Sequence, residues 1–127
     1  MISGNKKTGQ HGEDLAVDFL TKNGYHILEK NFRTKLGEID IIAQDQDTIS
    51  FVEVKSRTDA LFGSPLEAIT PFKRKKLSRA ALVFLKQHRL FEAKARFDIV
   101  TIEADESGSH NVHLLKNAFE LARPYGY

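Results

Sequence analysis

The chain has 127 residues, of which 41% are hydrophobic and 28% are charged, and its formal net charge is +2. These values predict one soluble domain over residues 1–127, because no apolar run approaches the roughly 20 residues that span a bilayer and residues 1–7 contain no apolar signal core. The absence of cysteine excludes disulfides and thiolate metal sites, and it agrees with a cytoplasmic location.

An amphipathic helix is predicted from about Thr8 to Asn23, where Gly24 is a typical C-terminal cap. Its apolar face comprises Leu15, Ala16, Val17, Phe19 and Leu20. At about 100° per residue, Gly12 and Glu13 also fall within this face. Gly12 would then let a neighbouring backbone approach closely, and Glu13 would be an inward-facing acid that needs a partner or a metal. The alternative for Glu13 is an ordinary acid at a helix start, favoured by the helix dipole.

Three strands are predicted next, and we expect them to form an antiparallel meander. The first covers residues 25–33 and reaches the second through a turn at residues 34–37. The second and third, residues 37–43 and 49–55, are rich in isoleucine and valine, and the polar linker 44–48 has the Asp and Gln typical of a turn.

Three charged residues interrupt the second and third strands: Asp40, Glu53 and Lys55. Side chains alternate between the two faces of a strand, so the register of the hairpin decides which of them share a face. A two-residue turn at positions 46–47, or a four-residue loop, pairs position 45 with 48 and therefore 40 with 53. A slip of one residue would send the two carboxylates to opposite faces.

Two carboxylates placed side by side repel each other, and a chain keeps such a pair when a cation bridges it. Mg²⁺ is the obvious bridge, because it prefers oxygen ligands and is commonly held by one or two carboxylates together with waters and substrate phosphates. Lys55 beside that metal could contact a phosphate oxygen, or orient a water and help to deprotonate it. The alternative is a hairpin face with ordinary solvated charges, and the spacing alone leaves both open.

A second helical region is predicted after a loop at residues 58–64. The helix-start signal of residues 64–67, with Ser, Pro and Glu in favourable positions, recurs at Thr70-Pro71. We therefore expect a short helical turn, then a longer helix from Pro71 to about His88. Its buried stripe comprises Leu77, Ala80, Ala81, Phe84 and His88.

This helix opens a strongly basic segment. Residues 71–96 contain nine Lys or Arg and one acid, so they carry +8, and the rest of the chain carries −6. Four of these cations are consecutive: Lys73, Arg74, Lys75 and Lys76. Cations at a helix start oppose the helix dipole, and we predict that this cluster contacts phosphate. The alternative is a solvated helix face, which is also the commoner meaning of the lone cations Arg33 and Arg57 at the ends of the meander.

The last elements complete an α/β domain. Residues 96–103 have a nearly continuous apolar centre, typical of an inner strand, and the long helix would join this strand to the third one in a parallel crossover. A turn at residues 105–109, an edge strand at residues 112–115 and at most a short helix at residues 117–121 follow. The predicted fold is a mixed sheet of about five strands flanked by helices.

The charged hairpin resembles the PD-(D/E)xK nuclease superfamily. Asp40 matches its metal-binding aspartate and Glu53-Val54-Lys55 its (D/E)xK element, although Ile39 stands where the superfamily motif has proline. Nearly end to end, the chain also resembles the bacterial YraN family. The segments that carry this resemblance are Gly9–Ala16, Gly24–Leu28, Asn31–Arg33, Gly37–Asp40, Phe51–Arg57, Arg96–Val100 and Asn117–Phe119.

The resemblance implies a restriction-endonuclease-like core and a metal-dependent endonuclease that hydrolyses structured or branched DNA. Asp40 and Glu53 would hold Mg²⁺ or Mn²⁺, and Lys55 would orient the attacking water. Glu13 matches an extra helical glutamate of the similar archaeal Holliday-junction resolvases, and it would assist at the metal. Because those resolvases act as dimers, a homodimer is possible.

Nucleic acid, with DNA favoured, is the expected partner. Its backbone would be held by Lys73, Arg74, Lys75 and Lys76, with Arg33 and Arg57 as weaker candidates. Such contacts carry no base information, so we expect recognition of structure rather than sequence. The alternatives are a nucleic-acid-binding module without catalysis, acting in a DNA-processing assembly, and a pure interaction protein in which both charge clusters are solvated.

Overall fold

The structure is a computed structural model, and it describes residues 2–57 and 65–121. No helix within these two ranges is both long and apolar enough to cross a membrane. The elements, in chain order, are helix α1 (Ile2–Lys22), strands β1 (His26–Thr34), β2 (Gly37–Asp45) and β3 (Thr48–Arg57), the short 3₁₀ helix η1 (Pro65–Ala68), helix α2 (Pro71–Gln87), and strands β4 (Lys94–Ala104) and β5 (His110–Phe119).

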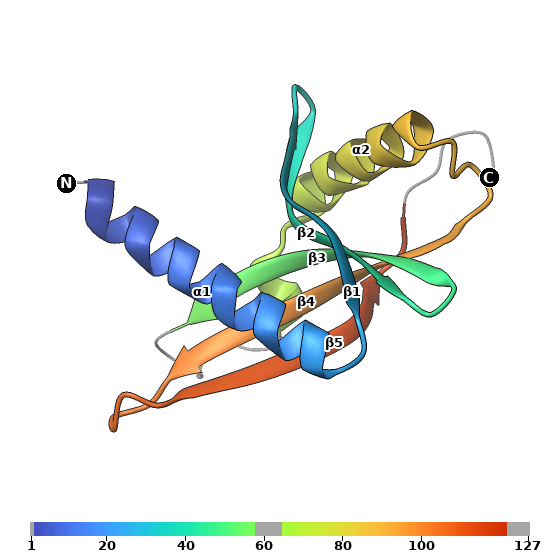
Figure 1. The fold of residues 1–127 in the computed structure, drawn as a ribbon. Helices are drawn as coiled ribbons and strands as arrows, with labels where there is room; N and C mark the ends of the chain where they lie inside the picture. Colours follow the sequence, from blue (N-terminus) through green and yellow to red (C-terminus); the bar gives the residue numbers. More distant parts are fainter. Residues whose placement is uncertain (1, 58–64, 122–127) are drawn as a thin grey trace.

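The five strands form one mixed sheet in the order β1-β2-β3-β4-β5. Strands β3 and β4 run parallel, and every other neighbouring pair runs antiparallel. Figure 1 shows α1 crossing one face of the sheet and α2 lying against the other. The predicted α/β class, with about five strands flanked by helices, is therefore confirmed.

Each helix closes its own hydrophobic core. The core under α1 comprises Ala16, Leu20, Tyr25, Ile41, Ala43, Val52, Val100 and Ile102. The core under α2 comprises Phe32, Ile39, Ile42, Ile49, Phe51, Ile69, Leu77, Ala80, Ala81, Phe84, Leu85, Phe97 and Ile99. The central strands send alternate residues to the two faces, which is why β4 lacks a polar side and reads as an inner strand.

Two elements differ from their predicted bounds. Helix α1 begins at Ile2 rather than Thr8. The residues before Thr8 are mostly polar and show no apolar periodicity, so the sequence did not predict this part of the helix. Strand β5 continues to Phe119, so the short helix expected at residues 117–121 is wrong. The strand continues because Asn117, with a φ of 54°, bends β5 where its register on β4 shifts, and the Phe119 ring then stacks on Phe97 at 4.4 Å. The expected loop at residues 58–64 lies outside the described residues.

Strand β2 parts from β3 before either strand ends, at a point that we call the fork. Backbone pairing between them ends at Ile41 opposite Val52. Strand β2 remains paired with β1 as far as Gly37, and β3 remains paired with β4 as far as Arg57. Beyond the fork, the β1–β2 hairpin continues as a two-stranded arm beside α2 (Figure 1).

The arm is held against α2 by close packing. The Phe32 ring meets the Phe84 ring edge-on at 5.4 Å, and Ile39 is 1% exposed in the α2 core. At Gly37 the backbone comes so near α2 that an added Cβ would lie 2.8 Å from the Lys76 carbonyl oxygen. The position of the arm, and therefore of the fork, depends on this contact.

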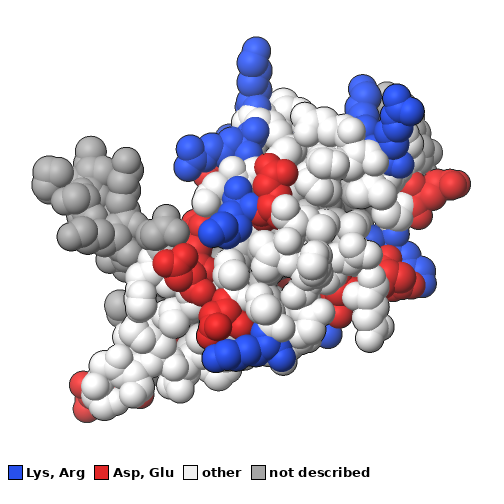
Figure 2. Space-filling model, viewed as in Figure 1, with Lys and Arg blue, Asp and Glu red and all other residues white. Residues whose placement is uncertain are grey.

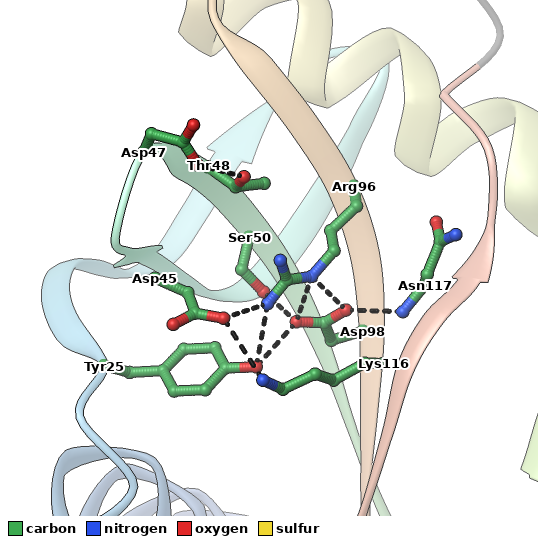
Figure 3. A network of polar contacts seen from close by, with 9 residues as sticks. All are labelled: Tyr25, Asp45, Asp47, Thr48, Ser50, Arg96, Asp98, Lys116 and Asn117. Carbon is green, nitrogen blue, oxygen red and sulfur yellow. Dashed lines mark hydrogen bonds and ion pairs between the residues drawn. The ribbon is translucent and has the colours of Figure 1, made fainter.

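A polar network ties the strands together between the fork and the turn that joins β2 to β3 (Figure 3). Asp98 on β4 is fully buried, and its carboxylate accepts hydrogen bonds from the Tyr25 hydroxyl at 3.0 Å, the Ser50 hydroxyl at 2.5 Å and the Asn117 N–H at 2.8 Å. Arg96 donates to the same carboxylate at 2.9 Å. Four strand or loop segments therefore meet at one buried carboxyl group whose oxygen atoms are supplied with donors.

A second acid, Asp45, lies at the edge of this network. Arg96 also donates to Asp45 at 2.6 Å, and the Lys116 ammonium lies 3.3 Å from the same Asp45 oxygen. Burial and the neighbouring Asp98 charge raise the pKa of Tyr25 above its usual range, so its hydroxyl stays protonated as a donor.

Replacing Asp98 by Asn is expected to lower the free energy of unfolding by about 3 kcal/mol, because it leaves buried donors and the Arg96 charge without their acceptor. Asp47→Asn is the matched control, since Asp47 forms an exposed ion pair with Lys94 that water and salt screen. Urea unfolding of both variants tests this, and equal losses would contradict the structural role of the network.

A second prediction concerns the arm. Gly37→Ala is expected to lower the free energy of unfolding by about 1–3 kcal/mol, because its Cβ would press on the backbone of α2. Gly12→Ala in α1 is the control: its Cβ would lie 2.7 Å from the Ser56 Oγ, a rotatable hydroxyl, and alanine favours the helix by about 1 kcal/mol. The close approach predicted at Gly12 thus comes from a side chain and not from a backbone.

A Gly37→Ala protein as stable as wild type in urea would show that the arm does not need the contact between Gly37 and α2.

Candidate active site

Asp40 and Glu53 lie at the fork, one step beyond the last backbone pair of β2 and β3. Pairing of Asp45 with Thr48 through to Ile41 with Val52 confirms the predicted register, which puts positions 40 and 53 opposite each other. The Asp40 carboxylate accepts the Val54 N–H at 2.8 Å, so a side chain continues the ladder where the backbones separate. The Glu53 side chain is 7% exposed. The two acids therefore share one partly buried place.

The Glu53 carboxylate affects the titration of Asp40. Burial and the negative charge of Glu53 raise the pKa of Asp40 to about 7, although the Val54 N–H lowers it. Glu13 on α1 adds a smaller repulsion that raises this pKa further. A carboxyl group that titrates near neutral pH, inside a cluster of acids, marks a functional-site candidate.

Two lysines accompany Glu53. The Lys73 ammonium, on the first turn of α2, lies 2.5 Å from the Glu53 Oε2, and the Lys55 ammonium lies 3.6 Å from the same oxygen. Burial and the neighbouring Lys73 lower the pKa of Lys55. For Lys73, burial opposes the charge, but the hydrogen bond to Glu53 and its negative charge raise the pKa overall. Lys73 is thus the firm counter-charge of Glu53, and Lys55 is the more easily deprotonated amine.

Glu13 approaches this cluster from the opposite side of the sheet. Its Oε1 is buried, and it has no hydrogen-bond partner among the described residues. In residues 2–57 and 65–121, no three His, Asp or Glu side chains are grouped closely enough to hold a metal ion as they stand. The structure therefore brings Asp40 and Glu53 together and leaves Glu13 nearby, with an oxygen atom that still lacks a donor or a cation.

These donors suit a hard divalent cation. Mg²⁺ and Mn²⁺ prefer oxygen ligands, and Mg²⁺ commonly takes one or two carboxylates and keeps several waters. Asp40 and Glu53 would bind such an ion directly. The unsatisfied Oε1 of Glu13 would accept a hydrogen bond from one of its waters.

The structure separates the residues predicted to bind nucleic acid into some that are paired within the protein and others that are exposed. Lys73 is paired with Glu53, and the Arg74 guanidinium turns inward to the Ile69 carbonyl at 3.0 Å. Lys75 and Lys76 are exposed on α2. The Nε atom of the exposed Arg33 lies 3.7 Å from the Glu38 Oε1. The side chain of Arg57 is not among those that the structure describes. Sequence reasoning missed the Lys73–Glu53 pair, because no local pattern indicates where α2 packs relative to β3.

Charge on the face crossed by α1 is mixed. Figure 2 shows basic and acidic side chains next to one another there, without a broad surface of one sign. Interspersed charges of this kind lower non-specific attraction to polyanions, so binding on this face would depend on a few placed cations.

The arrangement of a five-stranded mixed sheet, a helix on each face and charged residues at the fork of β2 and β3 defines a restriction-endonuclease-like α/β protein. Residues 12–102 match the sequence model of "Uncharacterised protein family UPF0102". The chain belongs to this family, also known as YraN, and the predicted membership is confirmed.

Relatives match over most of their length. The chain is 46% identical over 120 residues to a "UPF0102 protein" of Pelobacter propionicus, which covers 93% of this chain and 86% of the relative. It is 48% identical to a "UPF0102 protein" of Geotalea daltonii, with 93% of each chain covered. It is 43% identical to "UPF0102 protein GSU0650" of Geobacter sulfurreducens, with 93% of this chain and 92% of the relative covered.

The raised pKa of Asp40 predicts a pH dependence of stability in metal-free protein. The unfolded chain releases this proton near pH 3.9, whereas the folded protein holds it to about pH 7, so raising the pH between these values favours unfolding by at most about 1.4 kcal/mol per pH unit. Asp40→Asn removes the penalty: the gain of the variant over wild type should be small at pH 4.5 and several-fold larger at pH 8. Urea unfolding in a chelator measures this.

Asp18→Asn is the matched control, because Asp18 is an exposed acid on α1 that pairs only with Lys22 across one helical turn in the described contacts. Its stability difference from wild type should not change between pH 4.5 and pH 8. If Asp40→Asn behaved in the same way as this control, the acids at the fork would not be coupled.

Proposed function

We propose that this protein is a metal-dependent endonuclease that hydrolyses phosphodiester bonds of structured or branched DNA. The observation that carries the proposal is the meeting of Asp40, Glu53 and Lys55 at the fork, with Asp40 titrating near pH 7. A buried pair of acids with an amine beside it lowers stability. Arrangements of this kind are concentrated at sites that bind a ligand or carry out a reaction. Membership in UPF0102 adds no activity of its own, so the chemistry is argued from these side chains.

Asp40 and Glu53, with the Val54 carbonyl, are the ligands in this proposal. A bound Mg²⁺ or Mn²⁺ supplies charge stabilisation at the scissile phosphate and a water of lowered pKa. In the hydrolysis, a water oxygen forms a new bond to phosphorus, one ester P–O bond breaks, and the leaving oxygen takes up a proton.

Lys55 acts on the water and on the phosphate. Its ammonium, 3.6 Å from Glu53, is placed to orient the attacking water and to stabilise the negative charge that develops on the phosphate oxygens. Lys73 balances Glu53 until substrate arrives, and from α2 it can turn towards a phosphate oxygen. Glu13 holds a water at the rim of the site through its free oxygen.

A nucleic-acid-binding module without catalysis is the second candidate. The observation in its favour is that Glu13 does not close a three-acid group with Asp40 and Glu53 among the described residues. Lys55 argues against it, because a protein that only binds DNA does not need a half-buried amine beside two carboxylates.

Asp40→Ala should reduce cleavage of a branched DNA substrate by at least about 100-fold, because it removes a metal ligand, and Lys55→Met should reduce it by a similar factor. Asp18→Ala, on the exposed side of α1, should cleave like wild type. Cleavage is measured with Mg²⁺ and with Mn²⁺, and the thermal shift that Mn²⁺ produces reports metal binding separately.

The outcomes distinguish the two candidates. Wild-type cleavage that Asp40→Ala leaves intact would reveal a contaminating nuclease. Wild-type protein that retards branched DNA, but cuts none of it with either metal, would favour the binding module.

A further inference from the structure

The first turn of α2 carries a phenylalanine that the fold does not use. Phe72 is 68% exposed, whereas Phe84 on the same helix is 3% exposed in the core. The Lys76 ammonium lies 4.9 Å from the centre of the Phe72 ring, on one of its faces. Most of the ring is nevertheless open to solvent, so it can take a stacking partner.

Lys76, which lies over this ring, also lines a pocket between the tip of the arm and α2. Its volume is about 310 Å³, and it is lined by residues 34–38 of the arm and by Lys73, Lys76 and Leu77 of α2. Three cations, Lys35, Lys73 and Lys76, face one acid, Glu38, among these lining residues. The pocket therefore favours an anion.

The pocket connects the ring to the candidate active site. Lys73 lines the pocket and also contacts Glu53 at the fork, while Lys76 lines the pocket and covers Phe72. Leu36, which is 46% exposed at the tip of the arm, adds apolar surface to the same rim. A ligand that is both planar and anionic could contact the ring, the pocket and the carboxylate cluster in sequence.

We propose that this surface is a subsite for one unpaired nucleotide, whose base stacks on Phe72 and whose phosphate occupies the pocket beside Lys76. Aromatic side chains combined with a basic groove are the usual means of binding single strands without sequence preference. A base inside a duplex is already stacked on both faces and cannot use an isolated ring. The inference rests on the proposed function, and it narrows the substrate to DNA with a single-stranded segment next to the cleaved bond.

The test is fluorescence anisotropy in the presence of EDTA, so that binding is measured without cleavage. The probes are a labelled single-stranded oligonucleotide and the blunt duplex of the same sequence. Phe72→Ala should weaken binding of the single strand by about fivefold or more, the loss typical of one stacked base, and change duplex binding less than about twofold. Lys76→Gln should weaken both and reduce the salt dependence by about one phosphate contact.

Phe91→Ala is the matched control. Phe91 is 54% exposed and lies beyond the other end of α2, so its truncation should leave single-strand binding within about twofold of wild type. Equal losses in Phe72→Ala and Phe91→Ala, equal losses on single strand and duplex, or a change in the sedimentation of Phe72→Ala in place of a binding loss would overturn the subsite. The last result would mean that Phe72 contacts a second copy of the chain.

Failure of the subsite is separable from failure of the proposed function. If wild type cleaves branched DNA and Phe72→Ala binds single strands as well as wild type does, the nuclease stands and the subsite falls. If single-strand binding depends on Phe72 but no metal supports cleavage, the subsite stands and the nuclease falls.

Discussion

The separation of β2 from β3 after the Ile41–Val52 pair is the constraint on which the site depends. In a continuous ladder, Asp40 would be one more strand residue, and α1 and α2 would lie on opposite faces with the sheet between them. Because the strands part there, Glu13 can approach from the α1 side and Lys73 from the α2 side. The fork is therefore a place at which charged groups from both helical layers meet the same pair of acids.

Two clusters in the sheet treat buried acids in opposite ways. In the polar network, Asp98 has four kinds of donor and no acid closer than Asp45 at the edge of the network. At the fork, Asp40 has the single donor Val54 among the described contacts and two acids close to it, so its proton is held to near neutral pH. A saturated network holds strands in place, whereas an unsaturated one leaves coordination free for a ligand. This contrast separates the structural cluster from the chemical one more clearly than burial does.

Local sequence was sufficient to predict the register of β2 on β3, which leaves Asp40 and Glu53 one step beyond the last pair, because a short polar turn between two apolar strands leaves few alternatives. The sequence could not predict that Lys73 would contact Glu53 or that Arg74 would turn inward. Those contacts depend on where α2 packs, which is set by the fit of Gly37 and Phe32 against that helix and not by any local pattern. The helix expected at residues 117–121 was wrong for a similar reason, since Asp98 accepts the Asn117 N–H at the bend in β5 and the strand then continues along β4 to Phe119.

Lys73 links the stability of the free protein to the chemistry of the site. Glu53 is 7% exposed, and a buried carboxylate needs a positive partner in every state of the molecule. In this structure the partner is the Lys73 ammonium, which belongs to a helix and can rotate without moving the sheet. A divalent cation between Asp40 and Glu53 would compensate the same charge and make the lysine redundant there. The lysine would then be free to face the pocket that it already lines, so in the proposed nuclease one side chain would serve the carboxylate before substrate binds and a phosphate afterwards.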